Sequence, residues 1–374
     1  MQRILLTGGG TGGHIYPLLA ITKKIYDLAC LPVGMGFKNY ELRYYGPQSP
    51  YNDLLRQEGI EVYWVMGAKL RRYFSWLNLV DIFKLGLAVL QSLWYLTGWR
   101  PDAAFSKGGP GALPVLLACR LYGVPIIIHE SDAVMGLTNK ISSRWAAKVF
   151  QAWGPEGVGI PLREELLELA KKNAAERQIR FFARSEFGFD SAKPLILVLG
   201  GSQGSQRIND FIFQNLPGLL EKCHVLHQVG KTNFTEYKNK IALYNLPPTT
   251  YHLVSSFNVK EMAAAYAAAD LIISRAGSVI FEIAAFGKPS ILIPLPEAAN
   301  NHQLINAQTY AATGAAIIIE EPNLLKVTFN RLIEGVLDDR ERYQKMASAA
   351  RTFAKLTTAE TIANSLLTLA RGKC

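Results

Sequence analysis

The chain has 374 residues, of which 49% are hydrophobic, and this length favours two folded domains rather than a disordered protein or a single small core. Its four cysteines form no CxxC pair, which excludes a zinc or disulfide framework and predicts reduced thiols at Cys30, Cys119, Cys223 and Cys374. The net charge is +10, and residues 1–150 carry 16 Lys and Arg against 9 Asp and Glu, a net +7, so we expect the first half to face an anionic partner.

The first predicted element is a strand over residues 3–7, which leads into a glycine turn at 8–13 and an apolar helix. Backbone N–H groups of such a turn bind anions or sugar hydroxyls, and His14 places an imidazole beside that ligand. The turn has no Gly-Lys-Ser/Thr ending, which argues against an ATPase. Its spacing fits a dinucleotide fingerprint, but no acidic residue closes a second strand, so nicotinamide binding is disfavoured. The start of the chain differs from a signal peptide, so we expect a cytoplasmic location.

Short strands are predicted over residues 33–36 and 60–65, followed by a helix over 77–96 that ends near Gly98. Cations and bulky apolar residues gather at the start of this helix, and this pattern favours an anionic membrane surface over nucleic acid. The predicted membrane-facing residues are Lys69, Arg71, Arg72, Phe74, Trp76, Leu77 and Phe83. The apolar run is interrupted too early to span a bilayer. A second interpretation stays open, in which a stripe at helical spacing faces the core: Val80, Phe83, Leu87, Leu90 and Trp94.

Two more strands are predicted over residues 101–106 and 124–130, the first followed by a glycine turn at 107–111 and the second ending in His129 and Glu130. Alternating strands and helices predict a parallel sheet, whose ligands bind at the carboxyl ends of the strands. We therefore expect the three turns after these strands to share one rim. The Gly- and Pro-rich stretch 151–162 predicts a domain boundary.

The second half repeats the pattern of strand, glycine turn and helix, which predicts a second doubly wound domain. After a charged helical stretch at 163–184, the predicted elements are strands at 194–199, 225–229, 270–274 and 291–295, a helix at 259–268, a helix opening near Asn300, and helices from Arg340 to the end. The strand at 270–274 delivers Gly277 and Ser278 to its rim, and Glu282 follows about one turn into the next helix. A helix N-terminus with a carboxylate suits the diol of a nucleotide sugar.

Eight stretches in this order resemble the MurG family of GT-B-type glycosyltransferases. They are GGGTGGH (8–14), SKGGPGALP (106–114), HESDAVMGLTN (129–139), GIPLR (159–163), GGSQGS (200–205), EMAAAYAAADLIISRAG (261–277), FEIAAFGKPSILIP (281–294) and NHQLINA (301–307). The resemblance implies an α/β GT-B fold with two Rossmann-like domains facing across a cleft. We expect an acceptor- and membrane-facing domain at 1–158, a UDP-sugar donor domain at 159–349, and a C-terminal helix at about 350–374 that packs back on the first.

The resemblance also implies the reaction. It is an inverting transfer of N-acetylglucosamine from UDP-GlcNAc to the C4 hydroxyl of the MurNAc unit of undecaprenyl-linked lipid I, which forms lipid II in peptidoglycan synthesis. We expect neither a metal nor a cofactor. The implied partners are UDP-GlcNAc, lipid I, an anionic membrane surface and other cell-wall synthesis proteins, with no nucleic acid. The implied location is the cytoplasmic face of the cell membrane, as a peripheral protein.

Site residues carry over from the matching motifs. His14 is the candidate base, since an unperturbed imidazole titrates near 6.5, and Glu130 and Asp132 are the alternatives. The donor-binding residues implied are Thr11, Gly12, Gly13, Asp132, Arg163, Ser202, Asn258 through its backbone, Gly277, Ser278, Val279, Glu282, His302 and Gln303. The acceptor-binding residues implied are Gly12, His14, Gly108, Gly109 and Asn139.

The chain departs from the family's usual residues at Pro110, Asp132, Ile160 and Asn258, and the stretch from Arg275 to Glu282 is one residue short. These departures keep two alternatives open. One is a related GT-B enzyme that glycosylates another lipid, and the other is a catalytically silent membrane protein that binds a nucleotide sugar. Retention of His14, Ser202, Glu282 and Gln303 argues against the silent protein.

Overall fold

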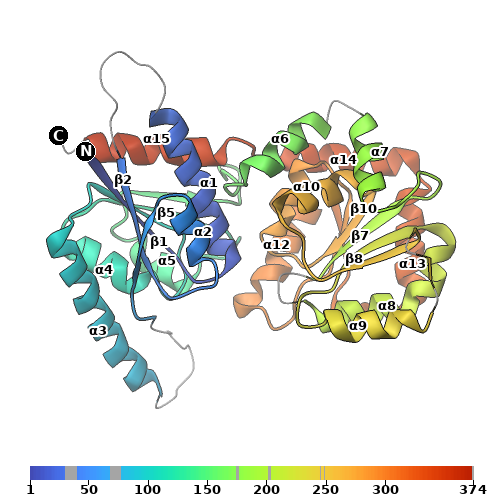
Figure 1. Cartoon of the computed structure of the whole chain (residues 1–374), viewed down its shortest axis with the longest axis horizontal. Helices are drawn as coiled ribbons and strands as arrows, with labels where there is room; N and C mark the ends of the chain where they lie inside the picture. The colour runs from blue at the N-terminus through green and yellow to red at the C-terminus, as the bar shows by residue number, and fades with distance from the viewer. Residues whose placement is uncertain are drawn as a thin grey trace. The chain divides into compact units, whose positions relative to one another are not determined.

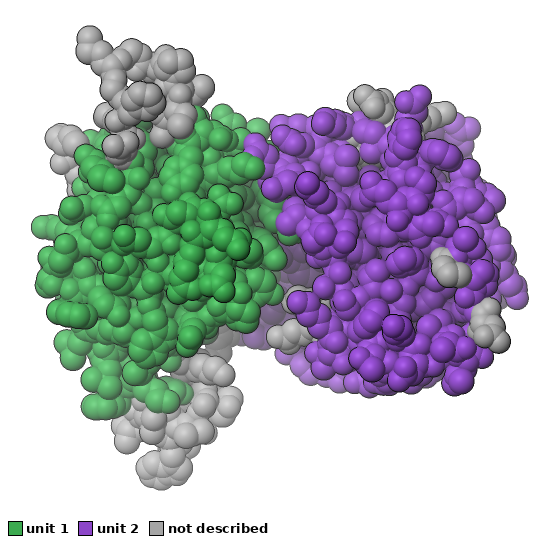
Figure 2. All heavy atoms as spheres, viewed as in Figure 1, with its two compact units in different colours: residues 1–163, 356–374 green, residues 164–355 purple. Residues whose placement is uncertain are grey.

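We analysed a computed structural model that describes residues 1–29, 40–67, 77–173, 177–200, 204–244, 246–247 and 249–372. The chain forms two compact units, one of Met1–Arg163 with Leu356–Cys374 and one of Glu164–Lys355 (Figure 2). Several sequence predictions lie outside the described residues: the strand at 33–36, Cys30, Cys374, Lys69, Arg71, Arg72, Phe74, Trp76 and Ser202. Leu77 is described only through its backbone.

The first unit is a parallel six-stranded sheet in the order β3-β2-β1-β4-β5-β6, covered by helices on both faces (Figure 1). Its elements are β1 (Gln2–Thr7), α1 (Gly12–Ala29), β2 (Tyr40–Gly46), α2 (Asn52–Gln57), β3 (Glu61–Trp64), α3 (Leu77–Gly98), β4 (Ala103–Ser106), α4 (Leu113–Leu121), β5 (Ile126–Glu130), α5 (Leu137–Ser142), β6 (Lys148–Gln151) and α15 (Thr358–Arg371).

The residues of strand β1 explain why helices cover both faces of this sheet. Ile4 and Leu6 belong to one apolar cluster with α1, whereas Leu5 belongs to a second cluster with α4. A strand that is apolar at consecutive positions can bury both of its faces, as strands of parallel sheets do.

The C-terminal helix α15 completes the first of these clusters. It packs alongside α1, and Ile362 and Leu366 are fully buried in the same cluster as Ile4 (Figure 1). The first unit is therefore built from both ends of the chain.

The second unit is also a parallel six-stranded sheet, in the order β12-β11-β10-β7-β8-β9. Its elements are α6 (Glu164–Asn173), α7 (Arg177–Glu186), β7 (Leu195–Leu199), α8 (Gln206–Lys222), β8 (His224–Gln228), α9 (Phe234–Ala242), β9 (Tyr251–Val254), α10 (Val259–Ala268), β10 (Leu271–Ser274), α11 (Val279–Ala285), β11 (Ser290–Leu292), η1 (Ala299–Asn301), α12 (His302–Ala311), β12 (Ala316–Ile318), η2 (Glu321–Asn323), α13 (Lys326–Leu337) and α14 (Arg340–Phe353). Two doubly wound parallel sheets confirm the predicted fold class.

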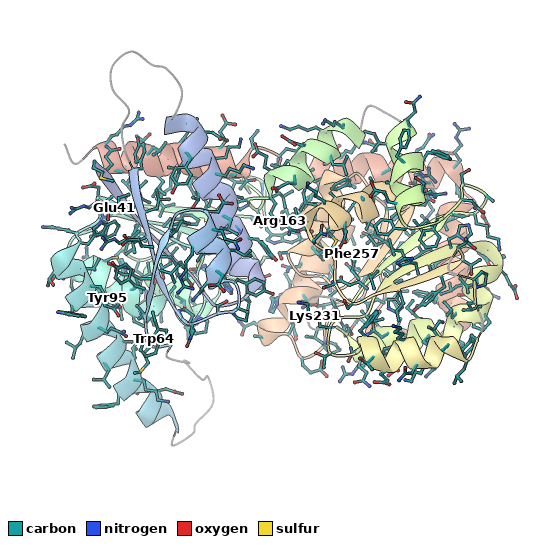
Figure 3. All side chains as sticks on the ribbon, viewed as in Figure 1. Glu41, Trp64, Tyr95, Arg163, Lys231 and Phe257 are labelled. Atoms are coloured by element: carbon teal, nitrogen blue, oxygen red, sulfur yellow. The ribbon has the colours of Figure 1, made fainter. Side chains whose placement is uncertain are left out.

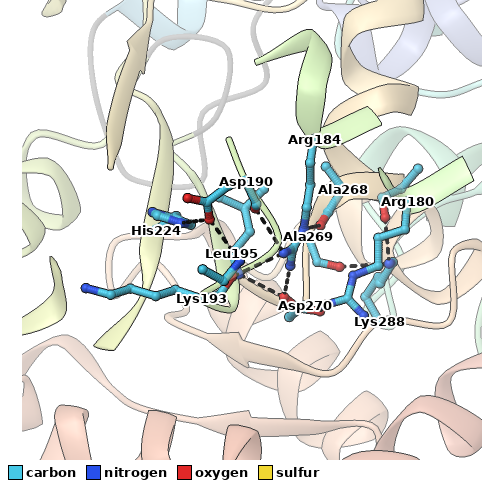
Figure 4. A network of polar contacts seen from close by, with 12 residues as sticks. Arg180, Arg184, Asp190, Lys193, Leu195, His224, Ala268, Ala269, Asp270 and Lys288 are labelled. Carbon is cyan, nitrogen blue, oxygen red and sulfur yellow. Dashed lines mark hydrogen bonds and ion pairs between the residues drawn. The ribbon is translucent and has the colours of Figure 1, made fainter. Parts of the chain in front are cut away.

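A buried polar network fixes the amino ends of β7 and β10 in this unit (Figure 4). Asp270 accepts a hydrogen bond from the Leu195 backbone at 2.8 Å and pairs with Arg184 and Arg180. Lys288 donates to the carbonyl oxygens of Ala267 and Ala269, and burial lowers the pKa of its ammonium to about 7. Since ligands of such sheets bind at the carboxyl ends, we assign this network to stability.

Strand β2 is a difference from the sequence-based expectation. It pairs along the whole of β1, from Gln2 opposite Tyr40 to Thr7 opposite Tyr45. It was not predicted from the sequence, because the strand contains charged residues. In the structure Glu41 and Arg43 pair with each other, while Tyr44 and Tyr45 are buried. In the part of the chain that the structure describes, no helix has both the length and the apolar character to cross a bilayer.

Candidate functional site

Three turns meet at one rim of the first sheet. Strands β1, β4 and β5 are neighbours, and Thr7 at the end of β1 lies opposite Ser106 at the end of β4. The turns that follow these strands contact each other through Gly9 and Gly109, and through Lys107 and Ser131. The predicted shared rim is confirmed.

His14 lies between two of these turns. A Cβ atom added to Gly9 would lie 2.8 Å from its Nδ1, and one added to Gly109 would lie 3.0 Å from its Nε2. Thr11 Oγ1 lies 2.8 Å from Nδ1 and fixes the plane of the ring. When Nδ1 donates its proton to Thr11, the Nε2 atom is free to accept one. Only glycine at both positions leaves room for this imidazole.

The electrostatic setting of His14 differs from the sequence-based expectation of an unperturbed imidazole. Burial and the nearby Lys107 ammonium lower the pKa of His14 to about 4, although the Asp132 carboxylate acts in the opposite direction. The imidazole is therefore neutral at pH 7, which is the form that a base requires.

Glu130 is held by hydrogen bonds within the loop that follows β5. It is 6% exposed, and its two oxygens accept hydrogen bonds from the Asp132 and Gly136 backbone and from the Asn139 amide, at 2.9–3.1 Å. These hydrogen bonds order the loop after β5, and a role of Glu130 as the alternative base stays a prediction. Asp132 is the carboxylate beside His14.

Asn139 is likewise buried, at 3% exposure. Its amide nitrogen donates to Glu130 and to the His129 carbonyl oxygen, and its side chain fills the space beside Gly108. Gly108 has φ +80°, and a Cβ atom there would lie 2.7 Å from the amide of Asn139. This geometry makes Asn139 a support for the second glycine turn, and its contact with the acceptor stays a prediction.

Lys107 is a residue of this site that the sequence reasoning missed. It is 3% exposed, at the start of the second glycine turn, and its ammonium donates to the Ser131 hydroxyl. Its position in the sequence could have identified it, because it lies directly after a buried strand and before two glycines. The ammonium of a lysine at such a place must either extend to solvent or have buried hydrogen-bond partners.

Arg163 belongs to the first unit (Figure 3). Its guanidinium carbon lies 4.5 Å from the centre of the Tyr16 ring, and its buried Nε has no hydrogen-bond partner among the described residues. Tyr16 also packs on Gly12, where an added Cβ would lie 3.0 Å from the ring. The first glycine turn and Arg163 therefore share one aromatic support, and the guanidinium keeps an unused donor.

In the second unit, the turn before α8 is held by Arg275. Ser205 caps α8, and Arg275 donates to its hydroxyl at 2.6 Å and to the carbonyl oxygens of Ile293 and Pro294. Arg275 also pairs with Glu321. This arginine joins the ends of β10 and β11 to Ser205 at the start of α8. The first backbone N–H groups of α8 are suitable donors to an anion.

Glu282 lies on α11, which begins at Val279 directly after Gly277 and Ser278. The Tyr266 hydroxyl donates to its Oε2 at 2.7 Å, which orients the carboxylate and leaves Oε1 as an acceptor. Gly277 has open space where a side chain would stand, so a ligand can approach the backbone there.

The remaining predicted donor residues lie at helix starts. Asn258 and Glu261 form a capping box on α10, so the Asn258 N–H donates to the Glu261 carboxylate and its carbonyl oxygen accepts from Met262. Gln303 accepts from the Leu295 backbone, and His302 Nδ1 lies 2.8 Å from the Ala299 carbonyl oxygen. A uracil contact by the Asn258 backbone stays a prediction, limited to the second lone pair of that carbonyl.

Helix α3 carries an exposed apolar stripe of Ile82, Phe83, Leu87, Leu90 and Trp94, of which Phe83 and Trp94 are 69% and 71% exposed. The interpretation that places Phe83, Leu87, Leu90 and Trp94 in the core is therefore wrong.

The opposite face of α3 is buried through Ala88, Ser92 and Leu96, and its small residues allow close packing on α4. The Tyr95 hydroxyl donates to the Trp64 carbonyl oxygen at 3.2 Å and ties the helix to β3 (Figure 3).

Within the described ranges, no group of three or more His, Cys, Asp and Glu side chains is arranged to hold a metal ion.

Comparisons with known proteins agree with this geometry. The family model for the glycosyltransferase family 28 N-terminal domain matches residues 4–151, and that for the C-terminal domain matches residues 195–364. A UDP-N-acetylglucosamine--N-acetylmuramyl-(pentapeptide) pyrophosphoryl-undecaprenol N-acetylglucosamine transferase of Clostridium botulinum is 33% identical over 92% of this chain and 93% of its own. The enzyme of the same name from Clostridium kluyveri is 32% identical over 94% of this chain and 96% of its own.

Solved structures are also similar. MurG of Acinetobacter baumannii has a TM-score of 0.74 at 28% identity, covering 98% of this chain and 100% of that one. A UDP-GlcNAc 2-epimerase of Neisseria meningitidis reaches 0.65 at 12% identity, covering 98% of this chain and 100% of its own, which shows a shared fold alone.

Proposed function

Because this chain belongs to the MurG family within glycosyltransferase family 28, we propose that it transfers N-acetylglucosamine from UDP-GlcNAc to the C4 hydroxyl of the MurNAc unit of lipid I, forming lipid II. The observation that carries this proposal is the neutral imidazole of His14, held between two glycine turns at the rim of the first sheet. A free base at such a rim suits the removal of a hydroxyl proton.

In this reaction His14 Nε2 takes the proton of the acceptor hydroxyl while the oxygen attacks C1 of the sugar. The bond from C1 to the diphosphate oxygen breaks on the opposite face, so the configuration at C1 inverts and UDP leaves with the electron pair. The Asp132 carboxylate offsets the imidazolium charge that forms on His14.

The second unit is the donor unit of this proposal. The N–H groups at the start of α8, with Ser202, bind the diphosphate, and Glu282 Oε1 accepts a hydrogen bond from the ribose. Arg163 provides a cation for the leaving UDP, supported by its unused Nε donor. His302 and Gln303 bind the sugar. With these groups in place of a metal ion, the transfer proceeds without a metal.

The test is transfer of labelled N-acetylglucosamine from UDP-GlcNAc to a lipid I analogue in detergent, with excess EDTA and no added metal. We expect lipid II to form at the same rate with and without the chelator. Loss of transfer with EDTA, restored by Mg²⁺ or Mn²⁺, would contradict metal independence. Binding of UDP-GlcNAc without turnover would favour another lipid acceptor or a silent binding protein.

The exposed stripe of α3 supports a peripheral place on an anionic membrane, on the cytoplasmic side where lipid I would be met. Five large apolar side chains at helical spacing present one continuous face, and residues 1–150 carry the net positive charge. An aromatic or leucine side chain that enters the interface contributes about 1.5–3 kcal/mol. Such a surface brings the protein to an acceptor that is held in the membrane by its lipid.

The double substitution Phe83→Ser with Trp94→Ser is expected to weaken binding to vesicles with anionic lipid by about 10-fold or more, since it removes two inserted side chains. Vesicle sedimentation measures the effect. The matched control is Phe181→Ser with Phe182→Ser on α7 of the second unit, where two aromatics are exposed to a similar extent, at 59% and 63%. Equal losses in both variants would contradict a membrane surface on α3.

A further inference from the structure

We propose that Lys107 is a positioning residue for the transfer: its buried ammonium joins the second glycine turn to the loop after β5 and sets a fixed positive charge beside His14. This inference rests on the proposed role of His14 as the base. It concerns a residue that neither touches the reacting atoms nor reaches solvent.

The backbone places Lys107 at the junction of all three turns. Its N–H donates to the Thr7 carbonyl oxygen at 3.0 Å, which ties the start of the second turn to the end of β1. A Cβ atom added to Gly8 would lie 3.5 Å from the Cβ atoms of both Lys107 and His14. Lys107 and His14 therefore flank the same glycine.

The side chain extends from this junction to the third turn. The ammonium donates to the Ser131 hydroxyl, and the Ser131 carbonyl oxygen accepts from Trp153 Nε1 at 2.8 Å. Ser131 is thus held from two sides, and the next residue along the loop is Asp132. By holding Ser131, Lys107 fixes the position of the backbone from which the Asp132 side chain extends.

The charges around Lys107 keep it protonated despite its burial. Burial lowers the pKa of its ammonium to about 8, while Glu130 and Asp132 act to raise it, so the group is mostly charged at pH 7. The groups that face His14 are this ammonium, the Asp132 carboxylate and the Thr11 hydroxyl. The cation disfavours the imidazolium and the carboxylate favours it.

This arrangement has a use in the proton cycle of the base. Before transfer, burial and the Lys107 charge together hold the pKa of His14 well below 7, so the imidazole is neutral and able to accept a proton. After transfer, the imidazolium stands near a cation and returns its proton to solvent readily. Asp132 limits the cost of the charged intermediate. A neutral side chain of similar length would preserve the packing but not this balance.

The test compares Lys107→Gln with Lys107→Arg. Glutamine keeps a donor for Ser131 but removes the charge, whereas arginine keeps the charge. The first measurement is the pKa of His14 from NMR titration of protein labelled with ¹⁵N-histidine, with the His14 signal identified by its loss in His14→Gln. We expect Lys107→Gln to raise this pKa by about one unit, because a nearby cation is lost, and Lys107→Arg to leave it near the original value.

The second measurement is the pH profile of kcat/KM for transfer. In Lys107→Gln the acidic limb is expected to move to higher pH with the His14 pKa, and kcat to fall about 10-fold or more. A fall in kcat with neither the His14 pKa nor the limb moved would show a structural role only and overturn the proposal. Ser131→Ala keeps the cation but removes its partner, so it should lower kcat without moving the limb. A limb that moves equally in Ser131→Ala would also overturn it.

Two outcomes separate this proposal from the function on which it rests. If the chain transfers no sugar to lipid I, the NMR titration still reports whether Lys107 sets the His14 pKa. If Lys107→Gln does not fold, as judged by its thermal midpoint, Lys107→Met provides the neutral comparison. An unchanged His14 pKa in whichever neutral variant folds would reject the inference even if transfer is robust.

Discussion

Replacing His14 by alanine is expected to lower kcat for sugar transfer by about 10²–10⁴-fold, the usual contribution of a general base. The imidazole lies against glycines of both turns, and its Nε2 is free to accept a proton when Nδ1 donates to Thr11. The measurement is the turnover of labelled UDP-GlcNAc at saturating lipid I analogue. Binding of UDP-GlcNAc, followed by calorimetry, should remain, because the donor-binding groups proposed on the second unit are unaltered.

The pH dependence gives the same prediction a second readout. A base works in its neutral form, so activity falls as pH drops through the pKa of His14. Burial and Lys107 lower that pKa to about 4, and the acidic limb of kcat/KM in the unaltered protein should therefore lie near pH 4 rather than near 6.5. His252→Ala, on the second unit, is the control and should leave both rate and profile unchanged. A His14→Ala variant that keeps its rate would transfer the role of base to Asp132.

The second large effect is expected from Gly109→Ala. Gly109 has φ +89°, and its new Cβ would lie 3.0 Å from His14 Nε2 and 3.1 Å from the Gly9 backbone. The methyl group stands against the atom that accepts the proton, so the ring must move or lose access to the acceptor. Because small displacements of catalytic groups are costly, we expect kcat to fall about 100-fold.

Gly123→Ala is the matched control for this variant. Gly123 also has a positive φ, +64°, but a Cβ there would meet nothing within 4 Å. Both substitutions carry the backbone strain of a positive φ, about 1–2 kcal/mol, and the close contacts of Gly109→Ala should lower its thermal midpoint further. Equal activity in the two variants, measured at a temperature where both are folded, would show that the close approach to His14 has no catalytic consequence.

Much of the fold could be predicted because parallel strands buried on both faces leave an unbroken apolar run. The runs at β1 and β7 both lead directly into glycine turns, and β7 is buried along its whole length. Strand β2 lacks this signal because its charged residues are compensated by ion pairs, Glu41 with Arg43 on the same strand and Arg43 with Glu61 on β3. Such pairs depend on register, which is set by tertiary structure.

The site was predictable where backbone chemistry dictates the residue. Glycines that enclose a side chain and a histidine at the start of a helix are visible in the sequence, and the structure brings His14, Gly9 and Gly109 together. The roles of Glu130 and Lys107 were not visible, because they depend on which hydrogen bonds each buried charge receives. The sequence shows a glutamate in the same way whether its carboxylate acts as a base or anchors a loop.

Helix α3 gives a third lesson. Helical spacing identified the apolar stripe but not the direction that it faces, and the interpretation that assumed the core was wrong. The packed face of α3 carries Ala88, Ser92 and Leu96, and the small residues among them allow the close approach to α4.

Helix α15 determines when each half of the molecule can mature during synthesis. The unit of Glu164–Lys355 is continuous in the chain, so all of its core is synthesised before α15. The first unit needs Ile362 and Leu366 against α1, so its earliest strands wait for the last helix to emerge. During that interval the apolar side of α1 is uncovered on the nascent chain, where it is a target for chaperones.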